Sequence, residues 1–302
     1  RNSSSAASDV YKRQGNGDRI GTVIVDTYEA SPFKNLGMDN PNGSQRYYIG
    51  HVDWTGFNGL VEYTGSENFS AVVQFGSSSQ TYQWEGFYTA APSTKSRKIT
   101  VDGGYIKGGA NYRMNRNSNI FFNVGQIMRP PSFDGVFPNA DYDFEEADDI
   151  TNESFTSFEL GYGYISSNFK ANINAYHTVW GDRTLRRSTS IDDQGVRIIY
   201  DGVEQTHQGI EAEMTWYPSN RLRIRGMASI GDWKYSKNFD GDAYFIDNNQ
   251  PAGTTGTLYL DGVKIGDAAQ SVLYIGADYK LSSKLSMDCL LYTSDAADEE
   301  LR

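Results

Sequence analysis

The chain has 302 residues and is acidic, with 38 Asp and Glu residues against 27 Lys and Arg and a formal net charge of −11 at pH 7. This balance argues against a nucleic-acid partner held by phosphate neutralisation. The sequence also contains no run of about twenty apolar residues, the length that a transmembrane helix needs. The 31 glycines, 21 tyrosines and 15 phenylalanines are instead typical of a large β-structure.

The two ends of the chain are related to each other at the level of DNA. Back-translation of SSAASDVYKRQ (residues 4–14) with suitable codons gives a string whose reverse complement, in a shifted frame, encodes CLLYTSDAADE (residues 289–299). Such a relation is typical of a sequencing-library adaptor read through at both ends of an insert. We therefore predict that residues 1–14 and 289–302 are translated adaptor, disordered or arbitrarily placed, and that genuine protein occupies residues 15–288.

The adaptor assignment changes what can be expected of the rest of the chain. The one cysteine, Cys289, falls in the adaptor, so no disulfide or thiol-metal site is expected in residues 15–288. An insert cut at both ends has also lost whatever preceded or followed it, including any targeting segment or further domain. Localisation therefore has to be inferred from the interior.

Alternation of apolar and polar residues predicts a series of strands. In chain order the candidates lie at residues 45–55, 59–65, 69–76, 80–90, 103–114, 119–127, 154–166, 168–181, 203–217, 221–235, 270–281 and 284–288. Several exceed ten residues, whereas strands of soluble sandwiches usually have about five or six. Their length favours tilted strands that cross a membrane.

The connections between these strands are of two kinds. Four are tight and rich in turn residues, at 115–118, 166–168, 218–220 and 282–283. Three are long and polar, at 128–153, 182–202 and 236–269, and they alternate with the tight turns. Short turns at one end and long loops at the other are typical of a bacterial outer-membrane barrel. The predicted fold is therefore all-β, an antiparallel transmembrane β-barrel.

The stretch HQGIEAEMTWYPSNRLRIRGMASIGDW, residues 207–233, predicts a hairpin with one apolar and one charged face. Together with neighbouring strands it gives a lipid-facing set: Phe122, Val124, Ile173, Ile210, Met214, Leu222, Ile224 and Ile230. The set expected to face a polar lumen, with its acidic and basic rows pairing across the hairpin, is Glu211, Glu213, Arg223 and Arg225. Candidates for aromatic girdles at the membrane surfaces are Tyr162, Tyr164, Trp180, Trp216, Tyr217 and Trp233.

Four runs carry a resemblance to a known family: GGANYRMNRNSNIFFNVGQIMRPPSFDGVF, NESFTSFELGYGYISSNFKANINAYHTVWGDRT, the hairpin run above, and GTLYLDGVKIGDAAQSVLYIGADYKL. They resemble the C-terminal half of the barrel of TonB-dependent outer-membrane receptors, of the kind found in Bacteroidetes. The resemblance covers residues 100–288 well and 15–100 more loosely. It implies a barrel of about 22 strands with a plugged lumen, located in the bacterial outer membrane.

The resemblance also implies a function and partners. Such receptors import scarce nutrients, such as siderophores, cobalamin or glycans, with energy supplied through the TonB protein. The expected partners are outer-membrane lipid, TonB reached through an N-terminal segment, a small-molecule or glycan substrate and a surface lipoprotein. The family's plug, TonB box and closing strand are not present in this sequence, so we expect an open, curved sheet that cannot transport alone. The alternatives are a passive porin-like barrel and a soluble β-rich binding protein.

The sequence shows no pattern of an enzyme or a metal site. His51, His177 and His207 are far apart, without the spacing of a zinc motif, and are expected to be ordinary strand residues. No GxSxG elbow or P-loop occurs, so we expect no catalytic residue and no cofactor. The run NADYDFEEADD (139–149) alternates oxygen ligands but lacks the glycine and final glutamate of a calcium loop, and is expected to be a solvated acidic loop.

The long loops offer the candidates for substrate contact, because a receptor must capture its ligand from outside. These are Arg129, Phe133, Phe137, Tyr142, Phe144, Phe239, Tyr244 and Phe245. Their aromatic rings suit stacking on a sugar or an aromatic chelate. The alternative is that the same rings pack the loops onto themselves.

Overall fold

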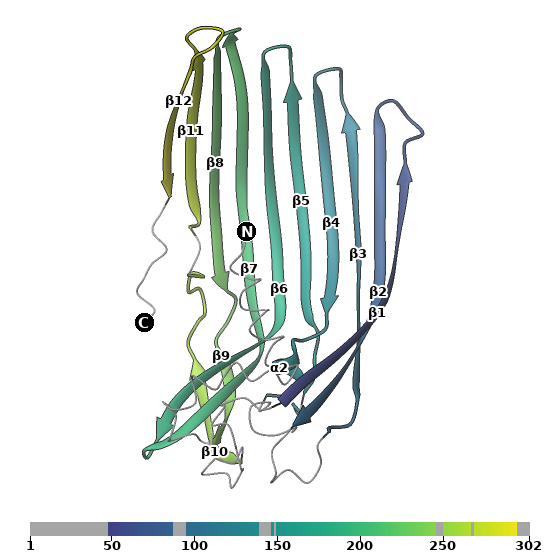
Figure 1. The fold of residues 1–302 in the computed structure, drawn as a ribbon, viewed down its shortest axis with the longest axis vertical. Helices are drawn as coiled ribbons and strands as arrows, with labels where there is room; N and C mark the ends of the chain where they lie inside the picture. The colour runs from purple at the N-terminus through teal and green to yellow at the C-terminus, as the bar shows by residue number, and fades with distance from the viewer. Residues whose placement is uncertain are drawn as a thin grey trace.

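The computed structural model describes residues 48–86, 95–138, 146–147, 149–245, 250–266 and 269–294, which form one antiparallel sheet of twelve strands (Figure 1). The strands are β1 (Tyr48–Tyr63), β2 (Phe69–Gly86), β3 (Ile99–Arg113), β4 (Ser118–Arg129), β5 (Glu153–Ile165), β6 (Phe169–Ile191), β7 (Gln194–Ser219), β8 (Leu222–Tyr235), β9 (Phe239–Phe245), β10 (Pro251–Leu258), β11 (Ser271–Lys280) and β12 (Ser286–Ser294). A single helical turn, α2 (Phe133–Val136), follows β4. None of the helical segments in these ranges is long and apolar enough to cross a membrane.

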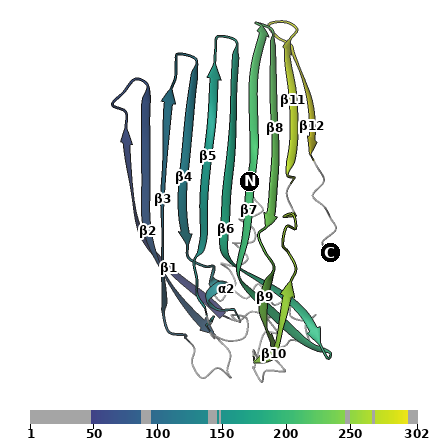
Figure 2. The same cartoon turned by 180° about the vertical axis from the view of Figure 1, so that it is seen from behind.

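The sheet is an open meander. Its main path runs in chain order from β1 to β8 and then to β11 and β12, so β1 and β12 form its two edges. The four turns expected to be tight lie together at one end, here called the turn end, and the three segments expected to be long loops lie together at the other, here called the loop end (Figures 1 and 2). The all-β antiparallel fold and the segregation of short turns from long connections are confirmed.

Strands β1 and β2 each unite two of the candidate strands. The sequence suggests breaks near Gly56–Gly59 and Gly76–Ser79, but both segments continue as paired strand. A Cβ added at Gly59 would lie 2.7 Å from the ring of Phe75, and one at Gly76 would lie 2.6 Å from the ring of Tyr105. These two glycines therefore make room for aromatic rings of neighbouring strands and do not mark turns.

The segment 182–202 is a continuation of the sheet, where a loop was expected. Strands β6 and β7 run past their neighbours and close in a tight turn at Asp192 and Asp193, both with positive φ (49° and 62°). Positive φ at both central residues defines a type I′ turn, which matches the twist of a hairpin. In the connection 236–269, β9 pairs with the extended part of β7 and β10 pairs with β9. These two strands were missed because the connection 236–269 as a whole is polar and rich in Asp, Asn and Gly, which are rare in strands.

Buried side chains gather at the loop end. One cluster contains Tyr82, Trp84, Ile99, Val136 and Phe137, and the other contains Tyr200, Val203 and Phe239. Between the loop end and the turn end, by contrast, large apolar side chains are exposed. The long connections thus pack around small hydrophobic cores at the loop end. The paired strands extend from these cores toward the turn end.

Residues 289–294, which were expected to be disordered or arbitrarily placed, lie in a strand. These residues complete β12, which pairs with β11 from Val272↔Ser294 to Lys280↔Ser286. All nine residues of β12 are exposed, so backbone hydrogen bonds hold this strand. The free edge of a sheet accepts almost any sequence in this way. The adaptor origin of these residues therefore stays a prediction.

Candidate functional site: the polar face of the sheet

One face of the sheet is apolar and uncovered. A row of directly opposite residues crosses five strands: Phe122, Leu160, Ala175, Ile210 and Ile230. The register and the alternation of side chains place all eight residues predicted to face lipid on this side: Phe122, Val124, Ile173, Ile210, Met214, Leu222, Ile224 and Ile230. Ile230 exposes 69% of its surface and Ile210 54%. We call this side the apolar face.

The girdle prediction is partly wrong. Tyr162, Tyr164 and Trp216 lie on the apolar face toward the turn end, as an interfacial belt requires. Trp180 and Trp233 lie on the opposite side, because they are directly opposite Phe155 and His207 rather than members of the apolar rows. Tyr217 also lies there, hydrogen-bonded to Arg223.

The opposite side, here called the polar face, carries all four residues predicted to face a lumen. Glu211 lies directly opposite Asn174, and Glu213 directly opposite Asn172. Arg223 and Arg225 follow on β8, nearer to the turn end. The amides and carboxylates form a continuous polar surface on strands whose other side is apolar. Such a wall suits contact with water and a polar solute.

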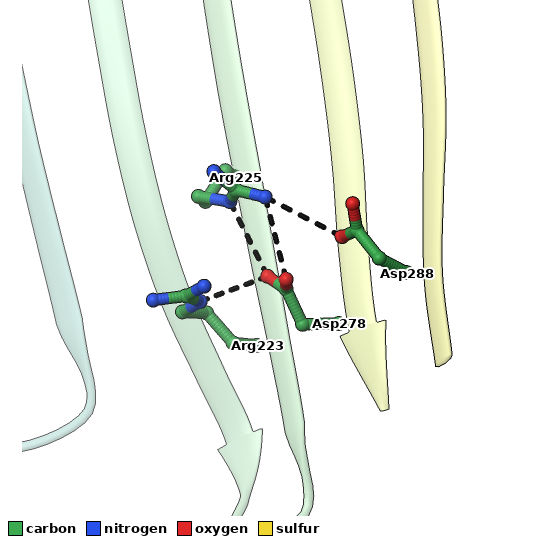
Figure 3. Close-up of polar contacts among 4 residues, drawn as sticks. All are labelled: Arg223, Arg225, Asp278 and Asp288. Atoms are coloured by element: carbon green, nitrogen blue, oxygen red, sulfur yellow. Dashed lines mark hydrogen bonds and ion pairs between the residues drawn. The ribbon is translucent and has the colours of Figure 1, made fainter. Parts of the chain in front are cut away.

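The arginines of β8 pair with Asp278 of β11, not with the glutamates of β7 (Figure 3). Arg223 Nε lies 2.8 Å from Asp278 Oδ2, and Arg225 contacts both Asp278 (3.3 Å) and Asp288 (3.4 Å). The register that puts Trp216 opposite Ile224 puts Glu211 opposite Ser229 and Glu213 opposite Met227, so the glutamates and the arginines share a face but lie at different levels of the hairpin. The expected pairing across the hairpin is therefore wrong, because alternation predicts the face of a residue and not its partner.

Each of these ion pairs is partly exposed, with 42% of the Arg223 side chain and 26% of the Asp278 side chain accessible. Pairs exposed to this extent contribute little to stability, because water and salt screen the charges and two long side chains lose entropy when they are held together. Their consequence is local order: one carboxylate holds two guanidinium groups on the polar face. The sequence analysis did not include Asp278 among the residues of the polar face. The alternation of apolar and polar residues in GADYKL (276–281) could have placed it there.

An aromatic and cationic cluster occupies the polar face toward the loop end. The rings of Phe155 and Trp180 stack at 4.9 Å with an interplanar angle of 25°. Arg129 forms an ion pair with Glu153, and its guanidinium lies 5.5 Å from the Phe155 ring and 5.9 Å from the Trp180 ring. The Trp180 indole N–H donates to Glu153 Oε2 at 3.0 Å. Of the residues predicted to contact substrate, Arg129 lies at this cluster. The sequence analysis did not predict Glu153, Phe155 or Trp180 as substrate contacts.

The other substrate candidates lie elsewhere. Phe137 and Phe239 are buried in the two loop-end clusters, and Phe133 packs against the first of them. Tyr244 and Phe245 belong to β9, where they pair with β7. Tyr142 and Phe144 lie outside the described residues. For Phe133, Phe137 and Phe239, packing of the loop onto itself accounts for the ring.

Two arginines of the extended β6–β7 hairpin hold the connection that contains α2. Arg186 donates to the carbonyl oxygen of Asp134, and Arg197 Nη1 donates to the carbonyl oxygen of Pro138 at 3.4 Å. Burial lowers the pKa of Arg186 from its usual value. The hairpin and the β4–β5 connection therefore form one unit over the loop end.

The three histidines lie apart, each in a strand. His51 bonds Glu85 at 2.7 Å, His177 bonds Gln208 at 3.3 Å and His207 bonds Gln205 at 3.4 Å. Across the described ranges, no group of three or more His, Cys, Asp or Glu side chains could hold a metal ion. The run 139–149 falls mostly outside those ranges; of its described residues, Glu146 forms an ion pair with Arg97.

Comparisons with known proteins identify the fold. No family model matches the sequence, and no curated protein matches it. Among solved structures, the copper transporter OprC aligns over 80% of this chain with a TM-score of 0.51 and 13% identity. The ferric-catecholate import receptor Fiu of E. coli K12 aligns over 81% with a TM-score of 0.51 and 10% identity. Both are TonB-dependent receptors.

The chain has the fold of a TonB-dependent receptor barrel. It spans 42% of the OprC chain and 34% of the Fiu chain, so the shared fold is that of a part of each barrel. The open order of the sheet fits such a part, because β1 and β12 do not close on each other. At these identities the likeness concerns the fold, and the ligand must be argued from the residues of the polar face.

Proposed function

We propose that this chain is part of an outer-membrane receptor that takes up a nutrient by energised, TonB-dependent transport. The apolar face lies against lipid, and the polar face forms the wall along which the ligand passes. The long connections at the loop end face the outside of the cell, and the tight turns face the periplasm. The ligand is transported without chemical conversion, so the protein needs neither a catalytic residue nor a cofactor.

The observation that carries this proposal is a sheet with one uncovered apolar face and one polar face, whose predicted short turns and long loops lie at opposite ends. Water-soluble proteins rarely expose contiguous apolar patches above a few hundred Å², yet the apolar face continues across the strands from β1 to β11. In a soluble sandwich this face would meet a second sheet. In a bilayer it needs no protein partner, and every internal strand has its backbone paired on both sides.

The proposal includes the partners and the part of the receptor that this chain represents. TonB would act through a plug and N-terminal segment encoded before residue 15, and a surface lipoprotein would sit over the loop end. Residues 15–288 would be receptor, and residues 1–14 and 289–302 translated adaptor. A passive porin shares the two faces and the arrangement of turns, and differs in having no plug.

The test is to recover the complete reading frame from the source DNA and express it in a strain that lacks its own receptors. We expect a plug domain upstream, closing strands downstream of residue 288, and uptake that stops when TonB is deleted. A reading frame in which a signal peptide leads directly into the barrel, with uptake that persists without TonB, would establish the porin instead. In the paragraphs below this full-length product is called the complete receptor.

A further inference from the structure

Arg183 lies over an aromatic ring at the loop end of the polar face. Its guanidinium carbon is 3.7 Å from the centroid of the Trp180 ring, the shortest cation–ring distance among the described residues. The same indole also stacks with Phe155, at 4.9 Å. Stacking of this kind fixes the plane of a guanidinium and leaves its N–H groups pointing outward.

The backbone is shaped to bring Arg183 there. The register between β6 and β7 shifts on both sides of Arg183, which marks an irregularity in the ladder. The preceding residue, Asp182, has a positive φ of 57°, and its carboxylate accepts a hydrogen bond from Ser154 at 2.6 Å. A non-glycine residue in this region is uncommon, and irregularities of this kind redirect a side chain. Here the redirected side chain is Arg183, which lies over Trp180.

The charge of Arg183 is not matched by a carboxylate of its own. In the described part of the chain no Asp or Glu forms an ion pair with it. The acid whose charge acts on it, Glu153, is already bonded by Arg129 and by the Trp180 indole. In the described part of the chain, therefore, the carboxylate of Glu153 is bonded by Arg129, and the half-buried Arg183 forms no ion pair with an acid.

We propose that Arg183 is an oxyanion-recognition residue of the transport path, which binds a carboxylate or phosphate group of the ligand. A planar guanidinium presents paired N–H donors that match the two oxygens of such a group. The aromatic stack excludes water from one side of the guanidinium, which strengthens the interaction with an anion. Arg129 lies beside it, with its own charge offset by the ion pair with Glu153. The proposal rests on the proposed function only in placing this group on the path of a ligand.

The local charge overrides the overall charge of the chain. The sequence carries a net charge of −11, which by itself disfavours anionic ligands. At this cluster, however, Glu153 and Arg129 offset each other in their ion pair, which leaves the positive charge of Arg183. An anion that reaches the loop end therefore meets a positive site within an acidic surface.

The experiment measures binding of small probes to the complete receptor in detergent micelles by ¹⁹F NMR titration. The probes are 4-fluorobenzoate and 4-fluorophenyl phosphate, with neutral 4-fluorobenzamide as the comparison. We expect at least one anionic probe to bind, and Arg183→Gln to weaken it by about tenfold or more, the loss of a charge-assisted pair. Arg183→Lys keeps the charge but loses the planar fork, so an intermediate loss is expected.

Two further variants separate binding from damage to the fold. Arg187→Gln makes the same charge change on an exposed residue of the same strand, and should leave binding unchanged. Glu153→Gln removes the competing carboxylate, and should strengthen binding severalfold, an effect that unfolding cannot produce. Binding of one anionic probe but not the other would identify the oxyanion as carboxylate or phosphate.

The inference is overturned if Arg183→Gln binds the anionic probes as well as the unchanged receptor does, or if 4-fluorobenzamide binds equally well. Neither result would affect transport, because the titration needs neither TonB nor an energised membrane. Conversely, a receptor that proves to be a passive pore could still bind the anions through Arg183. The two proposals therefore fail separately.

Discussion

Replacement of Ile173 by arginine is expected to destabilise the folded barrel by about 1–2 kcal/mol, because Ile173 lies on the lipid face between the bilayer midplane, where an Arg side chain costs most, and the interface at the turn end, where it costs least. Ile173 lies on the apolar face, exposes 46% of its surface and stands directly opposite Ala212 and Tyr162. The change in the free energy of unfolding can be measured by urea titration of the complete receptor in lipid vesicles.

The matched control is Asn172→Arg, one residue earlier on the same strand. Asn172 lies on the polar face, opposite Gly163 and Glu213, where a positive charge meets water and a carboxylate. We expect this variant to unfold within about 0.5 kcal/mol of the unchanged receptor, as surface substitutions usually do. Equal destabilisation by the two variants would contradict the assignment of the faces.

Replacement of Phe137 by alanine is expected to cost about 3–5 kcal/mol within the loop-end cluster, because it removes a fully buried ring. The cluster joins the β4–β5 connection to β2 and β3 through Tyr82, Trp84 and Ile99. The loss should therefore appear as local opening of this connection, with the strands near the turn end unaffected. Hydrogen exchange followed by mass spectrometry can compare peptides from the two ends.

The control for this variant is Tyr259→Ala, which removes an exposed ring, 77% accessible, from another loop-end connection. Exchange in the β4–β5 connection should be unchanged by it. If Phe137→Ala leaves exchange unchanged too, while it lowers ligand uptake, Phe137 contacts the substrate as the sequence suggested. That result would contradict a purely packing role.

The sequence predicts much of this fold because a strand has a period of two residues. Alternation alone places Ile173 and Ile210 on one face and Glu211 on the other, and the register confirms each of them. The same alternation predicts the polar face for Trp180, because it directly follows Val179, which belongs to the apolar row. Trp180 was nevertheless expected in a membrane girdle because aromatic residues are common there, and the alternation was the better guide.

Register and irregularities are the parts that sequence could not supply. The pairing of Arg223 with Asp278 joins residues 55 positions apart, and depends on how β8 aligns with β11. The position of Arg183 depends on a positive φ at Asp182. Aspartate can adopt this conformation, but its presence in a sequence does not predict it. The site at the loop end is therefore visible only once the strands are aligned.

The most direct test of the two faces is spin-label accessibility on β4 of the complete receptor in lipid vesicles, with any native cysteine of that protein replaced by serine. Nitroxides at Phe122, Asn123 and Val124 sample three successive residues whose sides alternate. We expect strong collision with oxygen dissolved in lipid at Phe122 and Val124, and with a water-soluble nickel chelate at Asn123. Accessibility to the nickel chelate at all three positions would contradict the membrane barrel.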